Sequence, residues 1–425
     1  EAQMPRNIYI ITATGLRPSH LSSHLYQNSQ TPAMDFLAYD GIRFLNAFTT
    51  SPESLSAHLS MLTGLYPFHR ALRNTLDGLL PDREATATAP VNMPEWFRER
   101  GYRTAVFASD PELRYPSFLK KLFGEVFIGP ALPPWKAAYD PPAVCKLAGD
   151  WVLRHRAEPQ LVLLNFAEPT LPFEPPPPFD RHYARHPYDG EIAALDREVG
   201  IWINTLKRAG LFENSIVVFA SPFGESLGDA VRIGSVSEQI IRIPLFIAAP
   251  GILPRHQEYE AAVSLVDVFP TLLKLLEANH SLQFDGLALF QKGNDEQVTR
   301  KLVFGETRIP ALFDEPAVYF ARTRQSQYTT GSMTSENPLR QQLAKRLARE
   351  GLPDPANVKN EAVQFGPVLE EIRITAMEGR LDVALQLVDS LLAQYPTSQF
   401  LQWYRSQIIF YSSESKSSEP AAANR

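Results

Sequence analysis

The stretch Asn7–Ala13 has the sequence NIYIITA, an uncharged run that is rich in β-branched residues. Such a run is typical of a strand that is buried on both faces of a parallel sheet. Similar runs follow, and we predict further strands at Tyr102–Ser109, Gln160–Glu168, Ser215–Ser221 and Ile243–Pro250. We therefore expect Asn7–Ala13 to be the first strand of a sheet that extends over much of the chain.

Helices with clear start and stop signals lie between these predicted strands. Thr31 and Pro32 begin one of them, as N-cap residue and first helical residue, and Gly41 ends it. The clearest helix spans Asp189–Ala209, where apolar residues recur at helical spacing: Ile192, Leu195, Val199, Trp202 and Leu206. This alternation predicts an α/β fold with a mainly parallel sheet between layers of helices.

The composition fits a large globular protein and excludes several functional classes. The chain has 425 residues, of which 44% are hydrophobic, so it can form more than one domain with a sizeable core. Its net charge of −6 argues against nucleic-acid binding through a broad basic face. No apolar run approaches the roughly 18 residues that a membrane helix needs, so we predict no transmembrane segment. The single cysteine, Cys145, excludes an internal disulfide and a thiolate metal cluster.

Proline is concentrated in two stretches, Pro130–Pro142 and Pro169–Pro178. We interpret both as long ordered loops over the sheet, which is where α/β proteins place their sites.

The N-terminal stretch Glu1–Asn7 is polar and shows no signal peptide. Either a leader was removed or the sequence starts inside a longer gene.

The strand–helix alternation stops near residue 330. We predict a polar connector over 331–364, with a charged amphipathic piece at Pro338–Arg349, and a disordered tail over 414–425. Between them, 365–413 is helical and resembles one and a half tetratricopeptide repeats, with Ala384 and Pro396 at the expected spacing. A generic helical hairpin explains the same pattern.

Six stretches of the chain resemble the sulfatases of the alkaline-phosphatase superfamily. The densest is Ser51–Pro67, SPESLSAHLSMLTGLYP, which is similar to the segment that carries the family's nucleophile. The others are Asn7–Leu21, Tyr188–Gly200, Asn214–Gly228, Ile241–Gly251 and Val263–Leu276. Because they occur in the family's order, the resemblance implies a sulfatase-like α/β domain over residues 7–330.

The resemblance also implies a divalent cation, usually Ca²⁺, held by oxygen ligands. The family has an aspartate ligand where this chain has Thr14, and an Asp-His pair where it has Pro222 and Phe223. Neither Pro222 nor Phe223 has a side-chain donor atom, and Thr14 offers only a weakly ligating hydroxyl. We therefore expect no bound metal.

Contacts to the sulfate group are altered in the same way. Thr170 stands where the family has a histidine after Asp-Pro, and Gln327 aligns with a family lysine. A further family histidine falls near Arg70. The charged groups that would hold a sulfate are thus replaced at Thr170 and Gln327.

The family's nucleophile falls at Ser54. Sulfatases convert a cysteine or serine there to formylglycine within a motif that contains proline and arginine, and both are absent after Ser54. We expect Ser54 to remain a serine and to serve as helix N-cap. His58 lies one helical turn further, so a Ser–His pair is conceivable, although the sequence identifies no carboxylate to orient it.

These substitutions predict a sulfatase-fold protein that has lost its catalytic centre and works in binding or assembly, without a cofactor. We expect a protein partner at the C-terminal helices. The resemblance adds an acidic or sulfated glycan as ligand and a periplasmic or extracellular location. The alternative is a hydrolase of sulfate or phosphate esters that uses Ser54, His58 and Arg70, and it would need a cation such as Ca²⁺.

Overall fold

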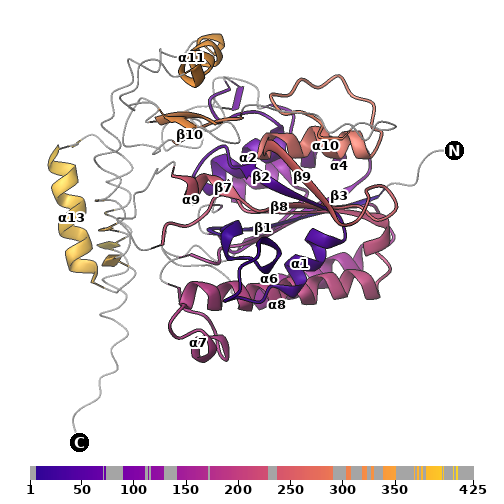
Figure 1. Cartoon of the computed structure of the whole chain (residues 1–425), viewed down its shortest axis with the longest axis horizontal. Coiled ribbons are helices and arrows are strands. Elements are labelled where there is room, and N and C mark those ends of the chain that lie inside the picture. Colours follow the sequence, from indigo (N-terminus) through magenta and orange to yellow (C-terminus); the bar gives the residue numbers. More distant parts are fainter. Residues whose placement is uncertain are drawn as a thin grey trace, which may run out of the picture.

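The computed structural model shows a central sheet between two layers of helices (Figure 1). It describes residues 6–69, 71–72, 90–110, 113, 116–128, 141–170, 173–227, 237–290, 303–307, 318–322, 327–329, 338–350, 368, 371–372, 375–376, 380–394, 396, 405 and 408–409. The predicted tail and the side chains of Arg70 and Gln327 lie outside the described residues.

The large sheet has the strand order β4-β3-β5-β1-β6-β8-β2-β7, and β9 pairs with β2. Its strands are β1 (Asn7–Ala13), β2 (Ile42–Phe48), β3 (Arg103–Ala108), β4 (Glu125–Ile128), β5 (Gln160–Phe166), β6 (Ser215–Ala220), β7 (Arg242–Ile243), β8 (Leu245–Ala248) and β9 (Gln257–Ser264). The strands from β4 to β6 pair in parallel, as β2 and β9 do, whereas β7 and β8 pair antiparallel with their neighbours. This confirms the predicted fold class.

Strand β1 lies inside this sheet, paired with β5 on one edge and β6 on the other. All seven of its residues are buried, because both faces of the sheet are covered. Ile8 and Ile10 belong to one core cluster, whereas Tyr9 and Ile11 belong to the other. The continuous apolar run in the sequence therefore reflects a strand that supplies two cores at once.

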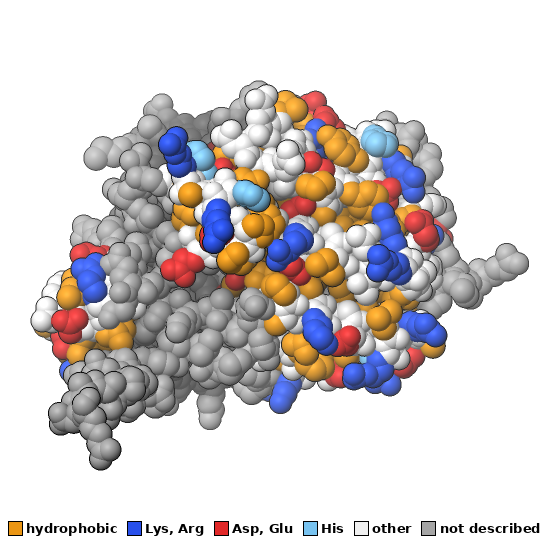
Figure 2. Space-filling view, turned by 90° about the horizontal axis from the view of Figure 1, so that it is seen from below, with side chains coloured by type: hydrophobic (Ala, Val, Ile, Leu, Met, Phe, Trp, Pro, Cys, Tyr) orange, Lys and Arg blue, Asp and Glu red, His pale blue; other side chains and the backbone are white. Residues whose placement is uncertain are grey.

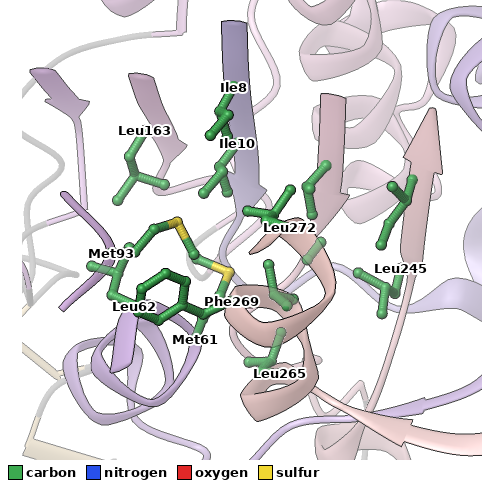
Figure 3. Packing of buried hydrophobic residues seen from close by; sticks show 14 of the residues in the cluster. Ile8, Ile10, Met61, Leu62, Met93, Leu163, Leu245, Leu265, Phe269 and Leu272 are labelled. Carbon is green, nitrogen blue, oxygen red and sulfur yellow. The ribbon is translucent and has the colours of Figure 1, made fainter. Parts of the chain in front are cut away.

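Each face of the sheet has its own set of helices. One face packs against α2 (Ser54–Thr63), α4 (Met93–Arg98) and α10 (Val268–Leu275). Figure 3 shows Met61 and Leu62 of α2 with Phe269 and Leu272 of α10 beside Ile8 and Ile10. The other face packs against α1 (Pro32–Tyr39), α6 (Pro141–Arg154) and α8 (Pro187–Arg208). The remaining short elements are α5 (Pro116–Leu122), α7 (Phe179–His182), α9 (Glu238–Ile241), η1 (Pro18–His20), η2 (Ser22–His24), η4 (Phe212–Asn214) and η5 (Leu265–Asp267).

Two predicted elements differ from the structure. The run Ile243–Pro250 forms two strands, β7 and β8, because Pro244 between them has no backbone N–H for the ladder. Helix α2 begins at Ser54 with Glu53 as its N-cap residue, so the N-cap interpretation of Ser54 was wrong by one position.

A second, antiparallel sheet follows, formed by β10 (Val303–Thr307), β11 (Val318–Arg322) and β12 (Gln327–Thr329). Helix α11 (Pro338–Arg349) packs against β11 and β12, and its Arg346 pairs with Asp285 at 2.5 Å. The amphipathic piece predicted in the connector is thus a helix attached to the main domain.

Helix α13 (Leu381–Gln394) follows later in the chain and buries Ala384, Val388 and Leu391 along one side. None of the described helices is long and apolar enough to cross a membrane.

Candidate functional site

Several of the predicted site positions that the structure describes meet at one edge of the sheet, where β1, β3, β5 and β6 end. The backbone N–H of Gly15, next to Thr14, donates to the carbonyl of Phe223 at 3.0 Å. Gly15 also lies directly against Pro169 and the methyl group of Thr170, so that a Cβ added there would lie 2.2 Å from the Pro169 carbonyl oxygen. The loops that carry Thr14, Phe223 and Thr170 are therefore in direct contact, as expected for the carboxyl ends of neighbouring strands.

Ser54 approaches the same edge from the first turn of α2 and is fully buried. Its Oγ donates to Oδ2 of Asp110 at 2.5 Å, and Oγ1 of Thr14 donates to the same oxygen at 2.8 Å. Asp110 is itself buried and lies just after β3. The structure thus joins Ser54 and Thr14 through a carboxylate that the sequence did not identify.

Asp110 is the site residue that the sequence analysis missed. It belongs to none of the stretches that resemble the family, and it is 56 residues from Ser54. The sequence did offer one signal for Asp110: it comes directly after the predicted strand that ends at Ser109. Polar residues at the carboxyl ends of strands in an α/β sheet lie where such proteins place their sites.

His58 is brought next to Ser54, as the one-turn spacing suggested, but its ring faces other partners. Nδ1 lies 2.7 Å from the backbone carbonyl of Ser54 and 3.2 Å from its Oγ, while Nε2 lies 2.9 Å from Oγ1 of Thr12. Burial lowers the pKa of His58, so the ring is neutral and carries one proton. A carbonyl oxygen can only accept, so the proton is on Nδ1, and Nε2 accepts from Thr12. With that assignment neither nitrogen can take the proton of Ser54.

Asn165 of β5 completes the network. Its Nδ2 donates to Thr12 Oγ1 at 3.1 Å, and its Oδ1 accepts from the backbone N–H of Asp110 at 3.2 Å. The hydrogen bonds therefore form a closed circuit that runs from Asp110 through Asn165, Thr12, His58 and Ser54 back to Asp110. A closed circuit of this kind satisfies buried polar groups and fixes their orientation.

The residues at the family's metal positions do not fit a calcium ion. Pro222 is buried and Phe223 half-buried, and neither side chain offers a donor atom. Thr14 already donates its hydroxyl proton to Asp110. Within the described residues there is no group of three or more His, Cys, Asp or Glu side chains that could hold a metal, whereas Ca²⁺ usually takes 6–8 oxygen ligands.

The loop that carries Thr170 is attached to α8 by Glu191. The Glu191 Oε1 atom accepts from the backbone N–H of Glu174 at 2.7 Å, and Oε2 is buried without a hydrogen-bond partner among the described residues. Burial, with the nearby Glu168 carboxylate as a second cause, raises the pKa of Glu191 to about 8. The Glu191 carboxyl is therefore held mainly in its protonated form at neutral pH.

Comparison with known proteins identifies the family. The Sulfatase family model matches residues 6–278. An ulvan-active sulfatase of Formosa agariphila is 25% identical over 392 residues, which is 80% of this chain and 74% of the relative. An arylsulfatase of Clostridium perfringens is 22% identical over 436 residues, covering 78% of this chain and 87% of the relative.

Solved structures with the same fold include two that cover most of this chain. BT4656 in complex with D-glucosamine-2-N,6-O-disulfate has a TM-score of 0.62 at 15% identity, covering 93% of this chain and 99% of that chain. The phosphonate monoester hydrolase of Agrobacterium radiobacter has a TM-score of 0.59 at 18% identity. The match covers 90% of this chain and 96% of that chain. With the family model matching well over half of its residues, this chain belongs to the sulfatase family.

Proposed function

We propose that this chain is a sulfatase-family protein without hydrolase activity, and that it binds an acidic or sulfated glycan. The observation that carries the first part is the state of Ser54 at the nucleophile position. It is fully buried, and its hydroxyl proton is donated to Asp110 within the closed circuit.

A serine hydroxyl needs a base or a cation to become a nucleophile near pH 7. His58 does not serve as that base, because its Nδ1 donates to the Ser54 carbonyl and its Nε2 accepts from Thr12. A cation would need ligands at Thr14, Pro222 and Phe223, where no carboxylate is present. Neither His58 nor a cation therefore activates Ser54, which leaves the Asp110 carboxylate as the one base in contact with its hydroxyl among the described residues.

The contact between Ser54 and Asp110 favours one alternative function. A buried carboxylate at 2.5 Å from the Ser54 Oγ atom is placed to accept its proton. Ser54 could then attack the sulfur or phosphorus atom of an ester: its proton passes to Asp110, the bond from sulfur or phosphorus to Oγ forms, and the bond to the ester oxygen breaks as the alcohol leaves. The attack would bring an anionic substrate next to the Asp110 carboxylate, which opposes binding unless a cation offsets the repulsion.

The proposed ligand class draws on relatives. One is named as active on ulvan, and one structural neighbour holds a disulfated glucosamine. An anionic sugar is therefore a ligand that this fold accommodates, and we propose it for this chain as well.

A separate proposal concerns the C-terminal helical region. Helix α13 presents Asp382, Asp389 and Gln394 to solvent and buries the stripe of Ala384, Val388 and Leu391. We propose that 365–413 is a tetratricopeptide-like element that contacts a protein partner through its outer side.

Activity measurements with two ester classes test the absence of hydrolysis. Wild-type protein, Ser54→Ala and Asp110→Asn are assayed with an aryl sulfate and an aryl phosphate ester, and Ser390→Ala on the exposed side of α13 is the matched control. We expect background rates in all four proteins. Turnover that persists in Ser390→Ala and disappears in both Ser54→Ala and Asp110→Asn would establish the Ser54–Asp110 hydrolase instead.

A further inference from the structure

The segment between the proline-rich loop and α8 carries an unusual density of basic groups. It runs from Phe179 to His186 with the sequence FDRHYARH, comprises α7 and the turn after it, and is called the α7 segment here. Four of its residues are cationic or can become so, and all four are exposed: Arg181, His182, Arg185 and His186. Asp180 is the one acidic residue of the segment, in a chain with a net charge of −6.

Within the part of the chain that the structure describes, no hydrogen bond or ion pair of these four side chains is present. Among the described residues, neither arginine forms an ion pair, and neither histidine ring contacts a carboxylate or an aromatic ring. By contrast, many other surface arginines pair with an acid, as Arg103 does with Glu158 and Arg242 with Glu238. Figure 2 shows blue and pale blue side chains together over this part of the surface. The α7 segment therefore presents unneutralised positive charge to solvent.

The α7 segment packs closely against α8. Pro175 and Tyr183 pack so closely on Gly190 that a Cβ there would lie 2.9 Å from each. The guanidinium of Arg197 lies 5.1 Å from the ring of Phe179, which adds a cation–π contact. Because the backbone of this segment is already packed in place, little of its conformational freedom is lost when Arg181 and Arg185 bind a ligand.

The α7 segment is also connected to the site edge. It continues directly from the loop that begins at Thr170, and that loop is attached to α8 through Glu191 and Glu174. In Figure 1 the segment projects beyond α8, away from the sheet. The loop at the site edge therefore leads directly into the exposed α7 segment.

We propose that the α7 segment is a binding surface for a linear acidic polysaccharide, with the guanidinium groups of Arg181 and Arg185 paired with sulfate or carboxylate groups. A guanidinium group matches such anions through paired N–H donors. Nucleic acid is disfavoured because the chain lacks a broad basic face. A lipid surface is disfavoured because such sites usually carry four to eight lysine or arginine residues, whereas the α7 segment has two arginines and no lysine. The proposal rests on the proposed glycan ligand, but it does not depend on the loss of catalysis.

Binding to dextran sulfate, measured at low and moderate salt with neutral dextran as blank, tests the proposal. The variant is Arg181→Gln/Arg185→Gln in the full chain. The matched control is Arg154→Gln/Arg156→Gln, which removes the same charge from exposed residues at the end of α6, at the opposite edge of the sheet. We expect the α7 variant to bind about tenfold more weakly, on the scale of two charge-assisted contacts, and the control to bind like wild type.

Three results would overturn this inference. Equal weakening in both variants would mean that net charge alone governs binding. No binding of wild-type protein to dextran sulfate would exclude the surface. Binding to vesicles with anionic lipids that is lost in the α7 variant, without a matching loss on dextran sulfate, would assign the surface to a membrane. Hydrolytic activity at Ser54 would refute the proposed lack of catalysis but would leave the binding result unchanged, so the two failures are distinguishable.

Discussion

The hydroxyl group of Ser54 donates a hydrogen bond of 2.5 Å to the carboxylate of Asp110, although the two residues lie 56 positions apart in the chain. Ser54 begins α2, and Asp110 follows β3. Thr14 donates to the same carboxylate oxygen, so Ser54 and Thr14 are joined through Asp110 within the protein interior. The Asp110 carboxylate thus connects α2 with the loop after β1 through two buried hydrogen bonds.

Replacing Asp110 should destabilise the protein. In Asp110→Ala the buried hydroxyls of Ser54 and Thr14 lose their acceptor, and we expect the free energy of unfolding to fall by about 2–4 kcal/mol. Urea unfolding followed by circular dichroism measures the change. Asp150→Ala, which removes an exposed carboxylate paired with Lys146, is the control and should change stability by less than about 0.5 kcal/mol. Equal stability of Asp110→Ala and wild type would show that the circuit contributes nothing.

Glu191 should make stability depend on pH. Its pKa is raised from 4.5 to about 8 in the folded state, so the folded protein holds a proton that the unfolded chain releases. The contribution of this proton is fully present below pH 4.5 and is lost as the pH rises through about 8. Glu191→Gln keeps the acceptor for Glu174 and cannot ionise. We expect it to be more stable than wild type at pH 9, by on the order of 1–3 kcal/mol, and similar at pH 5.

Thermal unfolding of wild type and Glu191→Gln over pH 5–9 measures this difference. Glu371→Gln is the control, because the Glu371 side chain is exposed and does not contribute to the raised pKa of Glu191. If the stability of wild type and of Glu191→Gln changes with pH in the same way, the Glu191 carboxyl is ionised in the folded protein over the whole range of pH 5–9, which would contradict its raised pKa.

Ser54 should be present as an unmodified serine. The residues after it lack the proline and arginine of the formylglycine motif, and its hydroxyl is bonded to Asp110. Mass spectrometry of the peptide spanning Ser51–His69 should give the mass calculated from the sequence. A peptide lighter by two hydrogen atoms at Ser54 would show that the modification takes place.

A chain that ends at Glu350 should stay folded and lose its partner contacts. It retains α11 with Arg346 bonded to both Asp285 and Glu350, and it lacks α13. Circular dichroism and gel filtration measure folding, and co-purification from the native host with both forms measures partner binding. If the shortened chain unfolds, residues 365–413 support the structure of the main domain. If the shortened chain co-purifies with the same partners as the full chain, residues 365–413 are not the partner-binding element.

Much of the fold was predictable because its signals are local. The uncharged run of β1 and the apolar stripe of α8 each determine an element without help from the rest of the chain. Strand β2 was missed because Arg43 and Asn46 interrupt its pattern, and its pairing with β9 depends on residues more than 200 positions away. Likewise, the second sheet and the attachment of α11 depend on long-range contacts such as the pair of Arg346 with Asp285.

The sequence predicted which residues come together at the candidate site, but it did not predict the hydrogen bonds between them. Thr14, Ser54, His58, Phe223 and Thr170 do meet at one edge of the sheet, because the motifs fix which strand end carries each. Asp110 could not be assigned, since its role arises only when β3 is placed beside β5. The orientation of the His58 ring was also beyond the sequence, because it depends on Thr12 and a backbone carbonyl.

Calcium binding tests the central claim most directly, because an active centre of this family would need the cation that Thr14, Pro222 and Phe223 cannot hold. Elemental analysis of the purified full chain after dialysis, combined with calorimetric titration with Ca²⁺, measures both retained and added metal. We predict well under one divalent cation per chain, no heat of binding, and a melting temperature that EDTA leaves unchanged. About one Ca²⁺ per chain, with a melting temperature that falls on adding EDTA, would contradict the account.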